Sequence, residues 1–281
     1  MQNSKKSAES RGVIVFAFNT TAVDYVSIAD KSSRLIKHNL NLPVTIVTDP
    51  DSNPKFDYDN IIRLTPDDGQ VNYRGAINNQ TVAWRNFGRY LAYELSPYDE
   101  TILLDTDYLV LDNSLNTLFE TDFDYKLMHH NVSTAGTDND IMGTLGLPFV
   151  WATVVLFRKS ERAERLFNLV ARIQRNYSYY RALYHITNQR FRNDFAFAIA
   201  NNILSGYSLN ELASVPWSML SIYHEIETIS TLGSFLKVNH TVTPDGKFPL
   251  TTILPRQNIH ILDKNYLLTP AFTELVDTIC G

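Results

Sequence analysis

Near the N-terminus, two short apolar runs flank a helical stretch, and this alternation limits the folds open to the chain more than any other feature. The run GVIVFAFN, residues 12–19, is long enough for a buried strand and too short for a core helix. Residues 24–40 place apolar side chains at three- and four-residue spacings, as a half-buried helix does, and residues 44–47 form a second apolar run. This order predicts a βαβ unit with two parallel strands and a right-handed crossover.

The same alternation continues along the chain. It predicts an α/β fold with a mostly parallel central sheet flanked by helices, in a single domain over 12–281 that follows a disordered polar segment, 1–11. Further strands are expected over 61–64, 101–104, 126–130 and 149–158, and helices over 82–95, 160–176 and 194–204. Residues 65–80 and 131–146 are expected to be loops, and the chain beyond Gly206 to be short strands and turns.

Composition narrows the class of protein. The chain has 281 residues, 44% of them hydrophobic, and contains no apolar run of membrane-spanning length and no secretory signal. Its one cysteine, Cys280, excludes an internal disulfide and fits a reducing, cytoplasmic setting. The net charge of -5 argues against sequence-independent binding of nucleic acid, and the basic residues between Arg158 and Arg165 are interpreted as a solvated helix start.

The motif with the most chemical content is the apolar run 101–104 followed by Asp105-Thr106-Asp107. In open α/β sheets, ligands bind at the carboxyl ends of the parallel strands, where this motif is expected to lie. Two carboxylates in a turn there can hold a hard cation, Mn²⁺ or Mg²⁺, which also binds diphosphate oxygens. Aspartates also end strands simply because they favour turns, so the motif alone leaves both interpretations open.

Three stretches of the chain resemble the GT-A glycosyltransferases, in particular the glycogenin and bacterial lipopolysaccharide galactosyltransferase group. Residues 88–91 and 97–107 resemble the family's helix with an arginine and its strand ending in the metal-binding D-x-D motif. Residues 150–157 resemble its acceptor-side strand, and residues 193–197 resemble the acidic start of a helix beneath the reacting sugar. The resemblance runs from about residue 12 to about residue 268 and implies a GT-A fold.

By this resemblance the chain is a glycosyltransferase that moves a sugar from a nucleotide-sugar, a UDP-sugar, to a hydroxyl with retention of configuration. Residues 12–112 are the nucleotide-sugar-binding half, and residues 113–281 the acceptor-binding half. Asp105 and Asp107 are the expected metal ligands, together with His260 late in the chain. His240 competes with His260 for that role, and a histidine on an apolar segment is often only a hydrogen-bonded core residue.

The resemblance also assigns the remaining site residues. The expected donor-binding residues are Ala17, Phe18, Asn19, Thr20, Tyr25, Asp49, Arg89, Asp105, Thr106 and Lys264. The expected acceptor-binding residues are Trp151, Ala152 and Thr153, which stand where many members have an Asn-Ser/Ala-Gly triplet, so the acceptor itself does not carry over. Asp194 and Asn193 are the expected catalytic residues. Asp263 stands where the family usually has a glycine, so the sequence around Lys264 departs from the family pattern.

Two rival functions and several acceptors stay open at this point. A nucleotidyltransferase also uses a carboxylate-bound cation on an α/β sheet, but residues 18–24 have neither glycine nor lysine to form its phosphate loop. A non-catalytic nucleotide-sugar-binding protein is the other rival, because fold does not fix function. The acceptor can be a glycan, a lipid-linked sugar, a protein or, as in bacteriophage-type members, a modified nucleic-acid base.

Overall fold

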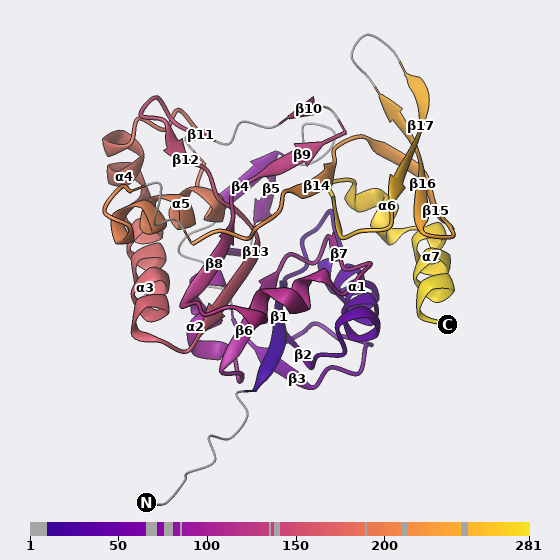
Figure 1. The fold of residues 1–281 in the computed structure, drawn as a ribbon, viewed down its shortest axis with the longest axis horizontal. Helices are drawn as coiled ribbons and strands as arrows, with labels where there is room; N and C mark the ends of the chain where they lie inside the picture. The colour runs from indigo at the N-terminus through magenta and orange to yellow at the C-terminus, as the bar shows by residue number, and fades with distance from the viewer. Residues whose placement is uncertain are drawn as a thin grey trace, which may run out of the picture.

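A six-stranded sheet forms the centre of the computed structural model (Figure 1). The structure describes residues 10–65, 72–75, 81–84, 86–134, 136–137, 141–188, 190–208, 213–242 and 247–281. The strand order is β3-β2-β1-β6-β13-β8. The strands are β1 (Arg11–Ala17), β2 (Val44–Thr48), β3 (Asn60–Arg63), β6 (Glu100–Leu104), β8 (Tyr125–Met128) and β13 (Trp151–Arg158).

The pairing of these strands confirms the expected α/β class with a mostly parallel sheet. Strand β1 lies parallel to both β2 and β6, and β2 lies parallel to β3. Strand β13 is the exception, because it runs antiparallel to β6 and to β8. The carboxyl ends of β1, β2 and β6 therefore share one edge of the sheet with the start of β13.

Helices flank the sheet on two sides (Figure 1). The helices α3 (Glu161–Arg175), α4 (Tyr177–Leu183) and α5 (Asn193–Leu204) lie on one side, and α1 (Tyr25–Leu40), α6 (Lys264–Leu268) and α7 (Pro270–Cys280) on the other. The shorter helices are η2 (Asn86–Leu91), α2 (Ala92–Leu95) and η3 (Ser114–Glu120). Asp24 caps α1 by accepting from the Ser27 amide, and Ser160 caps α3 as expected.

A second sheet pairs strands from the middle of the chain with strands from its C-terminal part. Its order is β10-β9-β14-β18-β7. Its strands are β7 (Tyr108–Leu109), β9 (Asn131–Ser133), β10 (Gly136–Thr137), β14 (Met219–Ile222) and β18 (Ile259–Ile261). The remaining strands are β4 (Asn72–Gly75), β5 (Thr81–Trp84), β11 (Ile141–Met142), β12 (Leu147–Pro148), β15 (Glu225–Leu232), β16 (Phe235–Val242) and β17 (Phe248–Pro255).

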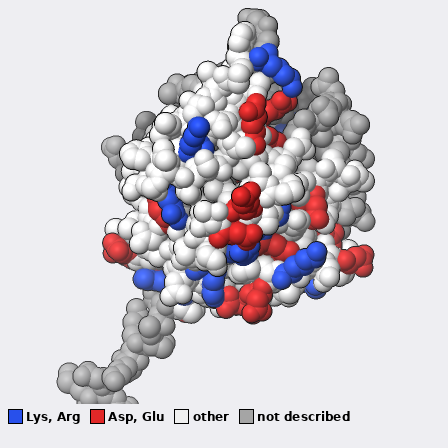
Figure 2. Space-filling model, turned by 90° about the vertical axis from the view of Figure 1, so that its right-hand side faces the viewer, with Lys and Arg blue, Asp and Glu red and all other residues white. Residues whose placement is uncertain are grey.

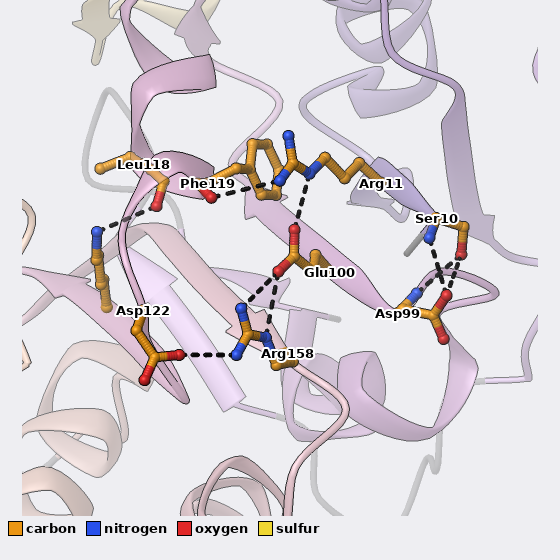
Figure 3. Close-up of polar contacts among 9 residues, drawn as sticks. Ser10, Arg11, Asp99, Glu100, Leu118, Phe119, Asp122 and Arg158 are labelled. Carbon is orange, nitrogen blue, oxygen red and sulfur yellow. Dashed lines mark hydrogen bonds and ion pairs between the residues drawn. The ribbon is translucent and has the colours of Figure 1, made fainter. Parts of the chain in front are cut away.

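At the end of the central sheet opposite the shared edge, the buried carboxylate of Glu100 joins two arginines (Figure 3). Its Oε2 atom accepts from Arg11 Nε at 2.8 Å, and its Oε1 atom accepts from Arg158 Nη2 at 2.9 Å. Arg158 also pairs with the exposed Asp122 at 3.0 Å. Arg158 is thus part of an ion-pair network that ties β1, β6 and β13 together, although the sequence suggested only a solvated helix start.

Several local expectations are wrong. The helix expected over 82–95 is instead the end of β5, then η2 and α2, and the loop expected over 65–80 contains β4 where it is described. The chain beyond Gly206 is not only short strands and turns, because it holds three eight-residue strands and the helices α6 and α7. Most of the segment 1–11 lies outside the described residues, but Arg11 already belongs to β1.

The surface and the helices carry two further findings. On the face shown in Figure 2, the described lysines and arginines are interspersed with aspartates and glutamates, so this face has no continuous basic surface. Among the residues that the structure describes, no helix has both the length and the apolar character needed to cross a bilayer.

Candidate functional site

Asp105 and Asp107 lie in the turn that follows β6, at the shared carboxyl edge of the sheet. The Asp105 amide donates to the Thr153 carbonyl at 3.0 Å, and the Asp105 carbonyl accepts from the Tyr108 amide at 3.2 Å. The turn thus brings the chain from β6 directly into β7 of the second sheet. Both carboxylates are held at the junction of the two sheets.

His260 reaches the same place from the far end of the chain. Strand β18 pairs antiparallel with β7, and the Ile261 amide donates to the Asp107 carbonyl at 2.9 Å. This ladder places His260 Nε2 3.6 Å from Asp107 Oδ1. One ligand atom from each of Asp105, Asp107 and His260 lies within 4.8 Å of the others. The three residues expected to hold a metal are therefore brought together.

A buried hydrogen-bond chain orients the imidazole of His260. Ser221 Oγ donates to Asn131 Oδ1 at 2.7 Å and lies 3.3 Å from His260 Nδ1. Since the Ser221 proton is used on Asn131, its oxygen is left to accept from a protonated Nδ1. In that tautomer the Nε2 lone pair of His260 faces the carboxylates, as a metal ligand requires.

Two basic side chains neutralise the carboxylates. Arg89 Nη1 pairs with Asp105, and Lys264 Nζ pairs with Asp107. Burial disfavours the charged form of Asp107, but Lys264 and His260 together hold its pKa well below the ordinary value. Both Arg89 and Lys264 thus lie beside the expected metal ligands, as the donor-binding expectation requires.

Lys264 reaches the carboxylates although the family's glycine is missing. Asp263, which stands in its place, accepts from the amides of Asn265 and Tyr266 and caps α6. Its other oxygen accepts from the Ile226 amide at 2.8 Å. Asp263 therefore fixes the start of α6, and Lys264 is the first residue of that helix.

The donor set fits a small hard cation. Mn²⁺ and Mg²⁺ bind oxygen and imidazole ligands at about 2.1 Å, so neighbouring ligand atoms on one ion lie about 3–4 Å apart. The 3.6 Å separation of His260 Nε2 from Asp107 Oδ1 is in that range. The arrangement of Asp105, Asp107 and His260 is compatible with such an ion, and the adjacent cations Arg89 and Lys264 suit diphosphate oxygens.

Asp194 lies against the start of β13. Its Oδ1 atom accepts from the Ala152 amide at 2.9 Å, and its Oδ2 atom pairs with the Arg192 guanidinium at 2.7 Å. The antiparallel partner of this region is the end of β6, since Val154 pairs with Leu104. Asp194, Ala152 and Thr153 therefore lie at the same edge of the sheet as Asp105, and their acceptor and catalytic roles stay predictions. Asn193, the first residue of α5, is buried.

The residues expected to hold the nucleotide share this edge but are largely engaged locally. Strand β1 ends at Ala17, whose side chain is buried with that of Phe18, so these two can offer a ligand only their backbone. Asn19 Oδ1 accepts from the Val26 amide at 2.9 Å, and Thr20 Oγ1 accepts from the Val23 amide at 3.0 Å. These contacts form the turn that joins β1 to α1.

Three more expected donor residues have definite places. Asp49 follows β2 and accepts from Ser52 Oγ at 2.8 Å. Tyr25, the first residue of α1, is half-buried against the core, and Thr106 is buried between the two aspartates. None of these positions identifies the nucleotide by itself.

His240 is not part of the carboxylate cluster. Its ring stacks on His224 with centroids 5.1 Å apart, and its Nε2 atom lies 2.8 Å from Thr252 Oγ1. Burial, followed by the influence of His224, lowers the pKa of His240. Of the two candidates for third ligand, the structure brings His260 to the carboxylates.

Sequence reasoning missed Arg192, Tyr223, Ser221 and Asn131. Arg192 pairs with Asp194 at 2.7 Å, and its pKa is raised chiefly by Asp194 and also by Tyr223 and Asp105. Arg192 had a sequence signal, because it directly precedes Asn193 and Asp194. Ser221 and Asn131 had none, since they are ordinary polar residues on strands whose pairing only the fold shows.

Comparison with known proteins yields structural likenesses alone. No protein-family model matches the chain, and no curated protein matches it. The apo glycosyltransferase GlyE of Streptococcus pneumoniae TIGR4 is 17% identical, with a TM-score of 0.38 over 73% of this chain and 45% of that one. This chain thus spans less than half of the GlyE chain.

Two further solved structures are similar over most of this chain. The galactosyltransferase LgtC, in complex with donor and acceptor sugar analogues, is 18% identical, with a TM-score of 0.44 over 69% of this chain and 71% of that one. Mouse xyloside xylosyltransferase 1 is 13% identical, with a TM-score of 0.41 over 70% of this chain and 83% of that one. These three solved structures are glycosyltransferases.

Proposed function

We propose that this protein is a metal-dependent glycosyltransferase that transfers a sugar from a UDP-sugar to a hydroxyl acceptor. One observation carries the proposal: Asp105, Asp107 and His260 lie together at the carboxyl edge of the sheet, beside Asp194 and the start of β13. Ligands of open α/β sheets bind at this edge. The transfer of a sugar from a nucleoside diphosphate needs positive charge near the diphosphate, which a bound cation would supply. Asp194 adds a buried carboxylate next to this cation site.

Each group has a distinct part in the proposed reaction. Asp105, Asp107 and His260 would hold Mn²⁺ or Mg²⁺, which would supply positive charge to stabilise the departing diphosphate. Arg89 and Lys264 add charge-assisted hydrogen bonds to the diphosphate oxygens. The bond from the anomeric carbon to the diphosphate oxygen breaks, a bond to the acceptor oxygen forms, and the acceptor hydroxyl loses its proton. The nucleoside diphosphate leaves with the electron pair.

Asp194 is the proposed charge stabiliser near the anomeric carbon. Its carboxylate is fixed from two sides by the Ala152 amide and by Arg192, so it costs little reorganisation when positive charge develops on the sugar. Asn193 precedes it on α5 and is the other candidate for this role. Retention of configuration remains part of the proposal and is read from the anomeric proton of the product by NMR.

The two rival functions lead to different measurements. A nucleotidyltransferase forms a new bond to phosphorus and releases pyrophosphate, whereas the proposed enzyme releases UDP. A non-catalytic binding protein binds the UDP-sugar with metal but does not cleave it. Slow hydrolysis of the donor, followed as UDP release, therefore separates the three without knowledge of the acceptor.

The decisive experiment compares the Asp107→Asn protein with wild type in calorimetric titrations of UDP and UDP-sugars, with Mn²⁺ or with a chelator. We expect metal-dependent binding in wild type and none in Asp107→Asn. Asp122→Asn makes the same chemical change on a carboxylate that is 97% exposed, and it is the matched control. Equal UDP affinity with chelator and with Mn²⁺ contradicts the proposal.

A further inference from the structure

A cavity of about 260 Å³ lies beside the start of β13, and aromatic side chains form part of its wall. Phe149, Trp151 and Phe195 line it, with the rings of Phe149 and Trp151 edge to face at 5.0 Å. Arg192 is the one charged side chain of its described lining. Its guanidinium lies over the rings of Phe149 and Phe195, at 5.8 and 5.6 Å from their centroids. The cavity has room for about one sugar ring, whose apolar face suits aromatic walls.

The cavity adjoins the carboxylate cluster. Trp151, which lines it, precedes Ala152 and Thr153, and these bind Asp194 and Asp105 through their backbone. Arg192, which also lines the cavity, pairs at 2.7 Å with the carboxylate of Asp194, and that carboxylate accepts from the Ala152 amide at 2.9 Å. A ring in the cavity is therefore within reach of a sugar held beside the metal ligands.

Among the polar side chains of the described lining, Arg192 and Asn188 offer N–H donors, and Thr187 offers a hydroxyl that can donate or accept. Asp194 binds the Nε and Nη2 atoms of Arg192, which leaves the Nη1 edge of the guanidinium. The indole N–H of Trp151 is buried with no partner among the described residues. Asn188 uses its side-chain oxygen on the Arg190 amide and its carbonyl on Tyr177, which leaves the amide N–H groups. A hydroxyl needs acceptors as well as donors, whereas an ionised carboxylate or phosphate only accepts.

The charged groups around the cavity also favour an anionic ligand. The described lining contains no acidic side chain, and the nearby Asp194 is matched by Arg192 itself and by the Ala152 amide. A guanidinium between aromatic rings is poorly hydrated and forms bidentate pairs with planar oxyanions. An anionic group in the cavity would meet the edge of the Arg192 guanidinium that Asp194 does not bind, and no acidic side chain of the described lining.

We propose that this cavity binds the acceptor as a sugar ring that carries an anionic group, a carboxylate or a phosphate, which Arg192 and Asn188 recognise. The role as acceptor site rests on the proposed sugar transfer; the recognition of an anionic sugar does not. The ring packs on Trp151 and Phe149, and its anionic group lies against the free edge of Arg192. An acidic glycan is thereby favoured over a neutral glycan, a protein or a nucleic-acid base.

The test titrates wild-type protein with methyl glucuronide, glucose 6-phosphate and methyl glucoside, followed by saturation-transfer NMR and calorimetry without metal or nucleotide. We expect at least one anionic sugar to bind about tenfold or more tightly than the neutral one, and the better of the two identifies carboxylate or phosphate. Equal affinity for all three sugars overturns the proposal, and so does tighter binding of the neutral one.

Two variants show where the anion binds. Asn188→Asp keeps the oxygen that accepts from Arg190 but adds a negative charge to the cavity, and we expect it to abolish the preference for anionic sugars. Asn53→Asp makes the same change on an exposed loop outside the cavity, and we expect it to leave the preference intact. Arg192→Gln should also abolish the preference. Anion binding that Asn188→Asp does not weaken belongs to another site, such as Lys264, and contradicts the proposal.

The proposed function and the proposed recognition of an anionic sugar are tested independently of each other. The titrations contain no metal and no nucleotide, so loss of the cation site in Asp107→Asn does not enter them. A protein that binds UDP with Mn²⁺ but shows no preference for anionic sugars retains the proposed function and loses this inference.

Discussion

The Nδ1 atom of His260 lies 3.3 Å from the Oγ atom of Ser221, a residue with no exposed surface. Ser221 in turn donates to Asn131 on the neighbouring strand. The second sheet therefore supports the proposed metal site through a hydrogen bond that fixes which nitrogen of His260 can bind an ion.

Ser221→Ala is expected to weaken Mn²⁺ binding about 10-fold or more, the scale found when a partner that orients a metal ligand is removed. Calorimetry or the EPR signal of free Mn²⁺ measures the affinity. NMR of the imidazole nitrogens, with the metal removed, should show the loss of a single preferred tautomer. Ser33→Ala truncates another serine with no exposed surface and is the control. Unchanged affinity and tautomer in Ser221→Ala would remove its orienting role.

Asp194→Asn is expected to reduce sugar transfer or donor hydrolysis per folded molecule by about 10²-fold or more. The amide oxygen can still accept from the Ala152 amide, but the charge opposite Arg192 is lost. Turnover is measured at saturating UDP-sugar and Mn²⁺ and corrected for the folded fraction by thermal unfolding. Near-normal turnover would make Asp194 a structural residue and leave Asn193 as the candidate.

Stability should depend on pH through Asp107. Its pKa in the folded protein lies below the ordinary value, so its ionised form contributes stability that is complete above about pH 4. That contribution is lost as the pH falls below this value towards the folded pKa. In urea unfolding with chelator present, wild type should exceed Asp107→Asn in stability by more at pH 7 than at pH 3. A difference in stability between wild type and Asp107→Asn that is larger at pH 3 than at pH 7 would contradict this prediction.

Glu100→Gln is expected to lower the free energy of unfolding by about 1–3 kcal/mol, because a buried carboxylate that binds two arginines loses its charge. Metal-dependent UDP binding should be unchanged, since Glu100 starts β6 and the carboxylate cluster follows its end. Urea unfolding and calorimetry give the two quantities. Asp122→Asn, on the exposed end of the same network, should cost less than about 0.5 kcal/mol.

The central sheet could be predicted because its strands are short apolar runs with clear ends. The runs at 12–19, 44–47 and 101–104 became β1, β2 and β6, and the two aspartates took the expected place after β6. The predictions that failed concern the secondary structure of single segments. Residues 82–84 have a helix-like pattern, but they pair with β4 in a hairpin, and that pairing overrides propensity.

The sequence predicted the aspartates of the candidate site and the basic side chains His260, Arg89 and Lys264 beside them, but not the residues that orient these groups. Asp105 and Asp107 share one motif, whereas Ser221 and Asn131 meet His260 through a parallel pairing of β14 with β9 and β18 that no local pattern encodes. Arg192 shows the same limit at shorter range. Its position beside Asp194 was visible in the sequence, but its place in an aromatic cavity depends on Phe149 from another strand region.

The ladder between β18 and β7 has a consequence for the order in which the protein matures. During synthesis the two aspartates and most of the central sheet leave the ribosome well before His260, so the nascent chain can form the sheet while its third ligand is still missing. Closing that ladder is one of the longest-range contacts of the fold and belongs to the slow, late steps of folding. Full affinity for a cation at the proposed site is therefore expected only after β18 has been synthesised and has paired with β7.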